Sequence, residues 1–103
     1  MTGFDFSDLY KQYPHIINQM DDVFTSHEFI LRLAQQNQAS YVTALYQYRN
    51  TVHRDASAPF MVVHGILAKK LRMHSDLVAY IGDVESTNIF GEPDECAQWQ
   101  KVK

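Results

Sequence analysis

The clearest pattern of apolar and polar residues along the chain begins at residue 24. Thr25 is followed three residues later by Glu28, the spacing of a capping box, in which side chains and backbone N–H groups at a helix N-terminus satisfy one another. Phe24 before the cap and Phe29 after it have the spacing of a hydrophobic staple. Apolar residues then recur at helical intervals: Phe29, Ile30, Leu33 and Ala34. The pattern predicts a helix that starts at Thr25 and ends near residues 37–40.

Two further helices are predicted downstream. The second runs from about Ser40 to Arg49, with an apolar and aromatic face: Tyr41, Val42, Leu45, Tyr46 and Tyr48. Residues 50–58 are mostly small and polar, which is typical of a loop. The third helix is expected to start between Ser57 and Pro59.

The third helix has two dissimilar faces when its residues are plotted at 100° intervals. One face is apolar: Phe60, Val63, Ile66, Leu67 and Leu71. The other combines small and basic residues: Met61, Gly65, Ala68, Lys69 and Arg72. Small residues let a helix backbone approach another molecule closely, and the cations supply attraction, so the second face is a candidate contact surface.

The two ends of the chain differ from this helical middle. Residues 4–22 predict an N-terminal arm with one or two short helices, whose aromatic residues pack on the body. From residue 76 the period changes: residues 77–81 are prone to form a strand, residues 91–94 predict a turn, and residues 96–102 a returning strand that contains Trp99. We therefore expect an antiparallel β-hairpin with a loop of about ten residues, which must pack on the helices to be stable.

These elements predict one mainly helical α+β domain over residues 1–103. It has an arm (residues 1–23), a helical core (residues 24–75) and a hairpin (residues 76–103). A chain of 103 residues with 46% apolar and 13% aromatic residues is long enough for one core and too short for two.

Charge is unevenly distributed along the chain, although the net charge is only −3. Residues 29–75 carry six Lys and Arg against one Asp, whereas residues 1–28 and 76–103 each have a net charge of −4. A basic middle segment is typical of a surface that faces a polyanion or an acidic partner. The alternative is that the acidic ends fold back over the basic middle and neutralise it.

The residues give no signature of an enzyme, a metal site or a cofactor site. The five histidines form no i,i+4 pair, and the only cysteine, Cys96, lies beside Glu95 in a predicted strand, which does not favour a reactive thiolate. One cysteine also excludes a disulfide within the chain. The four glycines are scattered and form no phosphate-binding loop. We therefore expect no catalytic residues, no metal ligands and no cofactor.

No apolar stretch approaches the roughly 18 residues that a membrane-spanning helix needs, so no membrane partner is expected. Asp5 and Asp8 stand where a secretory signal would carry basic residues. The expected compartment is the cytoplasm.

The order of elements over residues 24–102 resembles a winged helix-turn-helix domain: two helices, a third helix with the basic cluster Lys69, Lys70 and Arg72, then a hairpin. The resemblance implies a third helix in the DNA major groove, with these candidate contacts: Arg49, Arg54, Met61, Gly65, Ala68, Lys69 and Arg72. Three features depart from the family pattern. The turn before the third helix is long, no strand is expected between the helices, and the hairpin is acidic where a DNA-binding wing is usually basic.

Two functions remain open at this point. The first is a small DNA-binding regulator or accessory protein that contacts duplex DNA with the third helix. The second is a protein-interaction module or homodimeric adaptor without nucleic-acid binding, which the excess of Tyr, Phe and Trp favours because aromatic residues are enriched at interface centres. A basic patch gathered on the third helix would favour the first, and an exposed apolar patch the second.

Overall fold

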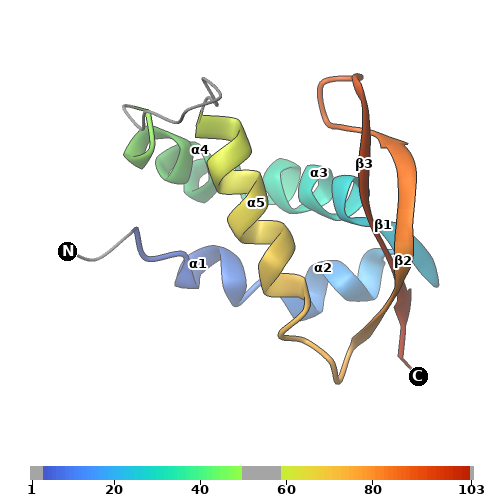
Figure 1. The fold of residues 1–103 in the computed structure, drawn as a ribbon. Helices are drawn as coiled ribbons and strands as arrows, with labels where there is room; N and C mark the ends of the chain where they lie inside the picture. The colour runs from blue at the N-terminus through green and yellow to red at the C-terminus, as the bar shows by residue number, and fades with distance from the viewer. Residues whose placement is uncertain (1–3, 50–58, 103) are drawn as a thin grey trace.

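A computed structural model describes residues 4–49 and 59–102 and confirms an α+β architecture (Figure 1). In chain order the elements are α1 (Ser7–Tyr10), α2 (Tyr13–Gln19), β1 (Val23–Thr25), α3 (Ser26–Gln36), α4 (Gln38–Gln47), α5 (Pro59–Leu71), β2 (Val78–Thr87) and β3 (Pro93–Lys101). The strands form one antiparallel sheet in the order β1-β3-β2. The sheet lies at one end of the helices, and the β2–β3 hairpin stands beside α5 (Figure 1). The predicted loop over residues 50–58 lies outside the described residues.

Strand β1 was not expected from the sequence: it lies between α2 and α3, directly ahead of the helix predicted to start at Thr25. Val23, Phe24 and Thr25 pair with Gln100, Trp99 and Gln98 of β3. The three residues are too short a run to predict a strand, and their pairing with β3 depends on residues more than 70 positions away. The sequence pattern therefore showed only the helix cap that follows.

The capped start of α3 is confirmed. The Glu28 backbone N–H donates to Thr25 Oγ1 at 3.1 Å, and the Thr25 backbone N–H donates to Glu28 Oε1 at 2.8 Å, so both halves of the capping box are present. The Phe24 and Phe29 rings lie 6.2 Å apart, as the staple requires. The helix ends at Gln36, with Asn37 as its C-cap, inside the predicted break.

Replacing Thr25 by alanine should lower the free energy of unfolding by about 1 kcal/mol, because the substitution removes the acceptor of the Glu28 N–H and half of the box. Urea unfolding of the wild type and the variant measures the difference. A control is Thr43→Ala: Thr43 is also helical, but its hydroxyl donates to the Ala39 carbonyl within α4 and caps nothing, so the cost should be clearly smaller. Equal costs for the two variants would contradict this account of the cap.

The hairpin is longer than expected. Pairing runs from Val78↔Lys101 to Thr87↔Pro93, so the loop covers residues 88–92 and is half the expected length. The outer part of the hairpin projects as two strands with mostly exposed or half-buried residues. When neither face of a strand pair is buried, its residues need not alternate between apolar and polar. The polar sequence of this part of the hairpin therefore predicted a loop. A register shift between Tyr80 and Gly82 bends β2, and Gly82 has a φ of 128° there, a conformation that favours glycine.

The core lies where α1, α2, α3 and α5 meet the sheet. Tyr13, Phe24, Phe29, Leu67 and Trp99 are among its fully buried side chains. The segment expected as an arm contributes directly to this core, because Phe6, Leu9, Ile16 and Ile17 are buried as well. The Tyr13 hydroxyl donates to the Leu67 carbonyl at 2.6 Å, which ties α2 to α5. Burial raises the pKa of the Tyr13 hydroxyl far above its ordinary value, so it remains a donor.

Within residues 4–49 and 59–102, no helix is both long and apolar enough to cross a bilayer.

Candidate functional site: a groove between α5 and the hairpin

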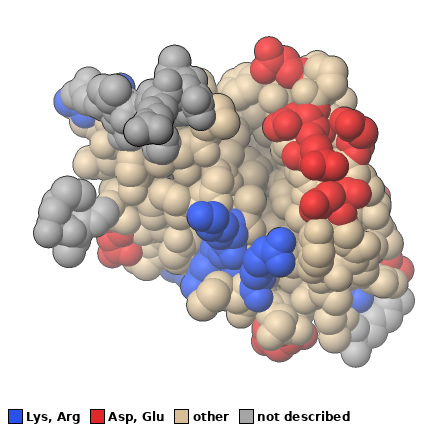
Figure 2. Space-filling view, in the orientation of Figure 1, with Lys and Arg blue, Asp and Glu red and all other residues tan. Residues whose placement is uncertain are grey.

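A groove of about 900 Å³ lies between α5 and the β2–β3 hairpin. The N-terminal turns of α3 and the buried Trp99 ring also line it. Its size lies within the range of about 300–1,000 Å³ that is usual for ligand-binding pockets. The groove arises because the hairpin stands away from α5 instead of packing on it along its whole length (Figures 1 and 2).

One wall of the groove is the α5 face that the sequence singled out. Met61, Gly65, Ala68, Lys69 and Arg72 all line it. Lys69 and Arg72 are exposed, and neither forms an ion pair with any carboxylate in the described part of the chain. The opposite helix face turns to the core, where Val63, Leu67 and Leu71 are fully buried. Helical periodicity was sufficient to group these residues on one face.

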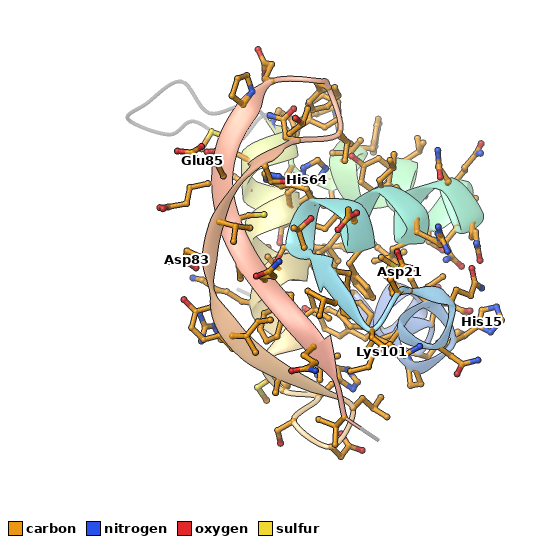
Figure 3. The ribbon with its side chains drawn as sticks, turned by 90° about the vertical axis from the view of Figure 1, so that its right-hand side faces the viewer. His15, Asp21, His64, Asp83, Glu85 and Lys101 are labelled. Carbon is orange, nitrogen blue, oxygen red and sulfur yellow. The ribbon has the colours of Figure 1, made fainter. Side chains whose placement is uncertain are left out.

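The other wall is acidic. Glu92, Asp94 and Glu95 line the groove from the hairpin, and all three are exposed. Residues 78–100 contain five carboxylates and no Lys or Arg. Figure 2 shows blue side chains over α5 and red side chains over the hairpin, on either side of the hollow. Figure 3 shows that two more of the five, Asp83 and Glu85, point away from the body of the protein.

Contacts with aromatic rings position several side chains of the groove lining. The Phe60 ring of α5 meets Phe90 of the hairpin loop edge-on, with the ring centroids 4.6 Å apart. The Arg72 guanidinium lies 4.6 Å from the Tyr80 ring centroid and 5.8 Å from that of Trp99. These cation–π contacts hold the Arg72 side chain against the sheet and leave its charge exposed. The hairpin and α5 are therefore in direct contact through Phe60 and Phe90, beside the open part of the groove.

His64 of α5 is a neutral residue of the groove lining. Its Nε2 lies 2.6 Å from the Tyr41 hydroxyl of α4, and its ring stacks on Tyr41 and Phe90. Burial, with a smaller contribution from the nearby His27, lowers the pKa of His64 to about 4. Burial also raises the pKa of Tyr41 to about 12, so both partners are uncharged near neutral pH. Figure 3 shows His64 inside the body, on the part of α5 that faces α3.

His27 connects α3 to the acidic wall. Its Nε2 lies 3.9 Å from Asp94 Oδ2, and its Nδ1 is buried with no hydrogen-bond partner among the described residues. This long contact is weak, so Asp94 keeps most of its capacity to interact with another molecule.

One predicted site residue, Arg49, is not brought to the groove, and Lys70 of the basic cluster points elsewhere. Arg49, just after α4, lies 3.8 Å from the Tyr46 ring of its own helix and does not line the groove. Arg54 lies outside the described residues. Lys70 packs over Tyr10, 4.7 Å from its ring centroid, on the side of α5 that faces the N-terminal helices. Of the cluster at residues 69–72, only Lys69 and Arg72 belong to the candidate site.

The described residues contain no cluster of three or more His, Cys, Asp or Glu side chains that could hold a metal ion. Cys96 is half-buried in β3 and lines the groove among apolar and acidic neighbours. The chemistry of the groove is therefore that of a binding surface: an apolar floor between walls of opposite charge.

Comparison of the chain with protein families, curated proteins and solved structures finds no significant match. The assignment of function therefore depends on the groove itself.

Gly65 is placed where a side chain would enter the groove without a clash. It is exposed in the middle of α5, and a Cβ atom built there meets no other atom within 4 Å. Gly65→Ala should therefore raise the free energy of unfolding by about 0.5–1 kcal/mol, because alanine has the better helix propensity. Thermal or urea unfolding measures the change. A destabilised Gly65→Ala variant would show that the groove is narrower than this structure has it.

Proposed function

We propose that this domain is a winged-helix-like protein-interaction module that binds a short segment of a partner protein in the groove between α5 and the hairpin. The observation that carries the proposal is the composition of the groove. The helix face expected to contact DNA forms one wall of an apolar hollow whose other wall is acidic. The antiparallel pairing of β1 with β3, beside the β2–β3 hairpin, supports the winged-helix resemblance of the scaffold.

The charges argue against a DNA duplex as the occupant. A helix that enters the major groove brings the adjacent hairpin close to the phosphates. Between residues 78 and 100, the only Lys, Arg, Asp or Glu residues of the hairpin are its five carboxylates. Like charges brought together in an interface cost several kcal/mol, and two cations on α5 do not offset five such groups.

Exposed apolar groups at the groove argue for a protein segment. The exposed fractions of Met61 and Phe90 are 67% and 53%, and Phe60 beside them is 36% exposed. Large apolar side chains gathered around a concave site are typical of a surface that another protein covers.

Duplex DNA binding is the second candidate, favoured by one specific observation. Lys69 and Arg72 are exposed on one face of α5 and free of ion pairs within the described residues. Under this candidate the wild type binds duplex DNA at about 50 mM salt, where electrostatic attraction is strong. Reversing both charges would then abolish binding, and each lost phosphate contact would reduce the slope of log affinity against log salt by about 0.9.

The test of the proposed function is a selection of random 12-residue peptides displayed on phage, carried out in parallel on the wild type and on Gly65→Leu. The leucine side chain would occupy the open space beside Gly65 and fill part of the groove. Peptides enriched on the wild type should be lost on Gly65→Leu, while Gly65→Ala retains most of them. Absence of enrichment on the wild type would overturn the proposal, and duplex DNA binding at about 50 mM salt would then favour the second candidate. Sedimentation of the wild type checks whether a second copy of the chain occupies the groove.

A further inference from the structure

The two walls of the groove face each other with opposite charges that do not neutralise one another. Lys69 and Arg72 line one wall and Glu92, Asp94 and Glu95 the other. No ion pair joins the two walls in the described part of the chain, where the only hairpin carboxylate with a charged partner is Asp94, paired to His27 of α3. Both sets of charges are therefore available to another molecule that binds in the space between the walls.

We infer that the partner segment carries an apolar side chain flanked by a basic residue on one side and an acidic residue on the other. This inference rests on the proposed function. The basic residue lies against the hairpin wall, and the acidic residue lies against Lys69 and Arg72. The apolar side chain between them packs on the exposed apolar groups of the groove lining: Phe60, Met61 and Phe90.

The apolar centre supplies the affinity. Met61 and Phe90 become covered when the apolar side chain packs on them, and burying apolar surface contributes about 25 cal/mol per Å². The small side chains at residues 65 and 68 leave room for the segment beside α5, because nothing lies within 4 Å of a Cβ at Gly65. A volume of about 900 Å³ accommodates a few residues of a segment and not a folded domain.

The charged flanks supply selectivity and direction. A segment bound in the opposite direction would exchange its two flanks. Its basic flank would then lie against Lys69 and Arg72, and its acidic flank against the carboxylates of the hairpin. Like charges would then meet on both walls, which is unfavourable. The segment therefore binds in one direction only, and a segment with two acidic flanks is rejected by the hairpin wall.

The test compares peptides selected on three proteins: the wild type, Glu92→Lys/Glu95→Lys, and the matched control Asp21→Lys/Asp76→Lys. Both variants change the net charge equally, and all four residues are exposed. Only Glu92 and Glu95 line the groove. Far-ultraviolet circular dichroism and the thermal midpoint verify that each variant is folded.

Peptides from the wild type and the control should be enriched in an apolar residue with a Lys or Arg neighbour. Those from Glu92→Lys/Glu95→Lys should lose the basic residue and gain an acidic one. A synthetic peptide made from the leading wild-type sequence should bind Glu92→Lys/Glu95→Lys at least tenfold more weakly and the control equally well.

Enrichment of apolar peptides with no preference for charge would overturn this inference and leave the proposed function intact. Enrichment that survives Gly65→Leu, or no enrichment on any of the proteins, would overturn both. The inference is also overturned if Glu92→Lys/Glu95→Lys and the control Asp21→Lys/Asp76→Lys select the same peptides.

Discussion

Replacing Trp99 by alanine is expected to lower the free energy of unfolding by about 3–5 kcal/mol. Only 2% of the Trp99 side chain is exposed, and it lies at the centre of the sheet, paired with Phe24 of β1 and Tyr80 of β2. Its Nε1–H donates to Ser26 Oγ at 2.9 Å, so alanine leaves both a cavity and a buried hydroxyl without its partner. Because a small domain has only about 5–15 kcal/mol of stability, this loss is a large part of the total.

Urea unfolding measures this effect, with Trp99→Phe as the matched control. Phenylalanine keeps most of the apolar area but removes the hydrogen bond and a small part of the ring volume, so it should cost about 1–2 kcal/mol. Adding Ser26→Ala to Trp99→Phe should cost less than the sum of the two single changes, because they remove the same bond. A loss below about 1 kcal/mol for Trp99→Ala would mean that the hairpin is not anchored to α3 through this residue.

Acidification from pH 6.5 to pH 4 is expected to destabilise the protein by about 2 kcal/mol through His64 alone. Burial lowers the pKa of His64 in the folded protein to about 4, whereas an unfolded chain has the ordinary value of about 6.5. Above pH 6.5 the imidazole is neutral in both states and the stability is complete. As the pH falls, the unfolded chain takes up a proton that the folded protein takes up only near pH 4, so stability is lost across this window. The shift corresponds to about 3.4 kcal/mol, and the partial exposure of His64 to solvent reduces the effect to about 2 kcal/mol.

The measurement is urea unfolding at several pH values between 7.5 and 4 for the wild type and His64→Gln. The other ionisable residues are the same in both proteins, including His74, whose pKa is also lowered by burial. The difference between the two curves therefore reports His64. The wild type should lose more stability than the variant between pH 6.5 and 4, and identical slopes would contradict a buried neutral imidazole at this position.

Local patterns predicted the helices, because the groups that define them are close in sequence. Thr25 and Glu28 form the capping box from three residues apart, and the two faces of α5 follow from helical periodicity. The sheet depends on contacts between distant residues. Phe24 pairs with Trp99, and Trp99 bonds to Ser26 across 73 positions, so neither β1 nor the full hairpin could be predicted from local pattern.

The same distinction applies to the candidate site. Periodicity predicted that Gly65, Ala68, Lys69 and Arg72 share a face. It could not predict what lies opposite, because the position of Glu92 and Glu95 beside α5 depends on the register of β3 against both of its neighbouring strands. The acidic character of the hairpin was visible in the sequence as a departure from the winged-helix pattern. Only the tertiary structure shows that the acidic hairpin and the basic face of α5 line opposite walls of one groove.

The central claim, that the groove binds a protein segment and not DNA, is tested most directly by two-dimensional ¹⁵N NMR of the wild type. Two ligands are titrated at about 50 mM salt: a selected synthetic peptide and a 20-base-pair duplex. The account predicts that the peptide shifts the backbone amides of Gly65, Ala68 and Cys96 and the indole N–H of Trp99, the only tryptophan in the chain, while the duplex shifts none of them. Shifts along α5 with the duplex, and none with the peptide, would contradict it.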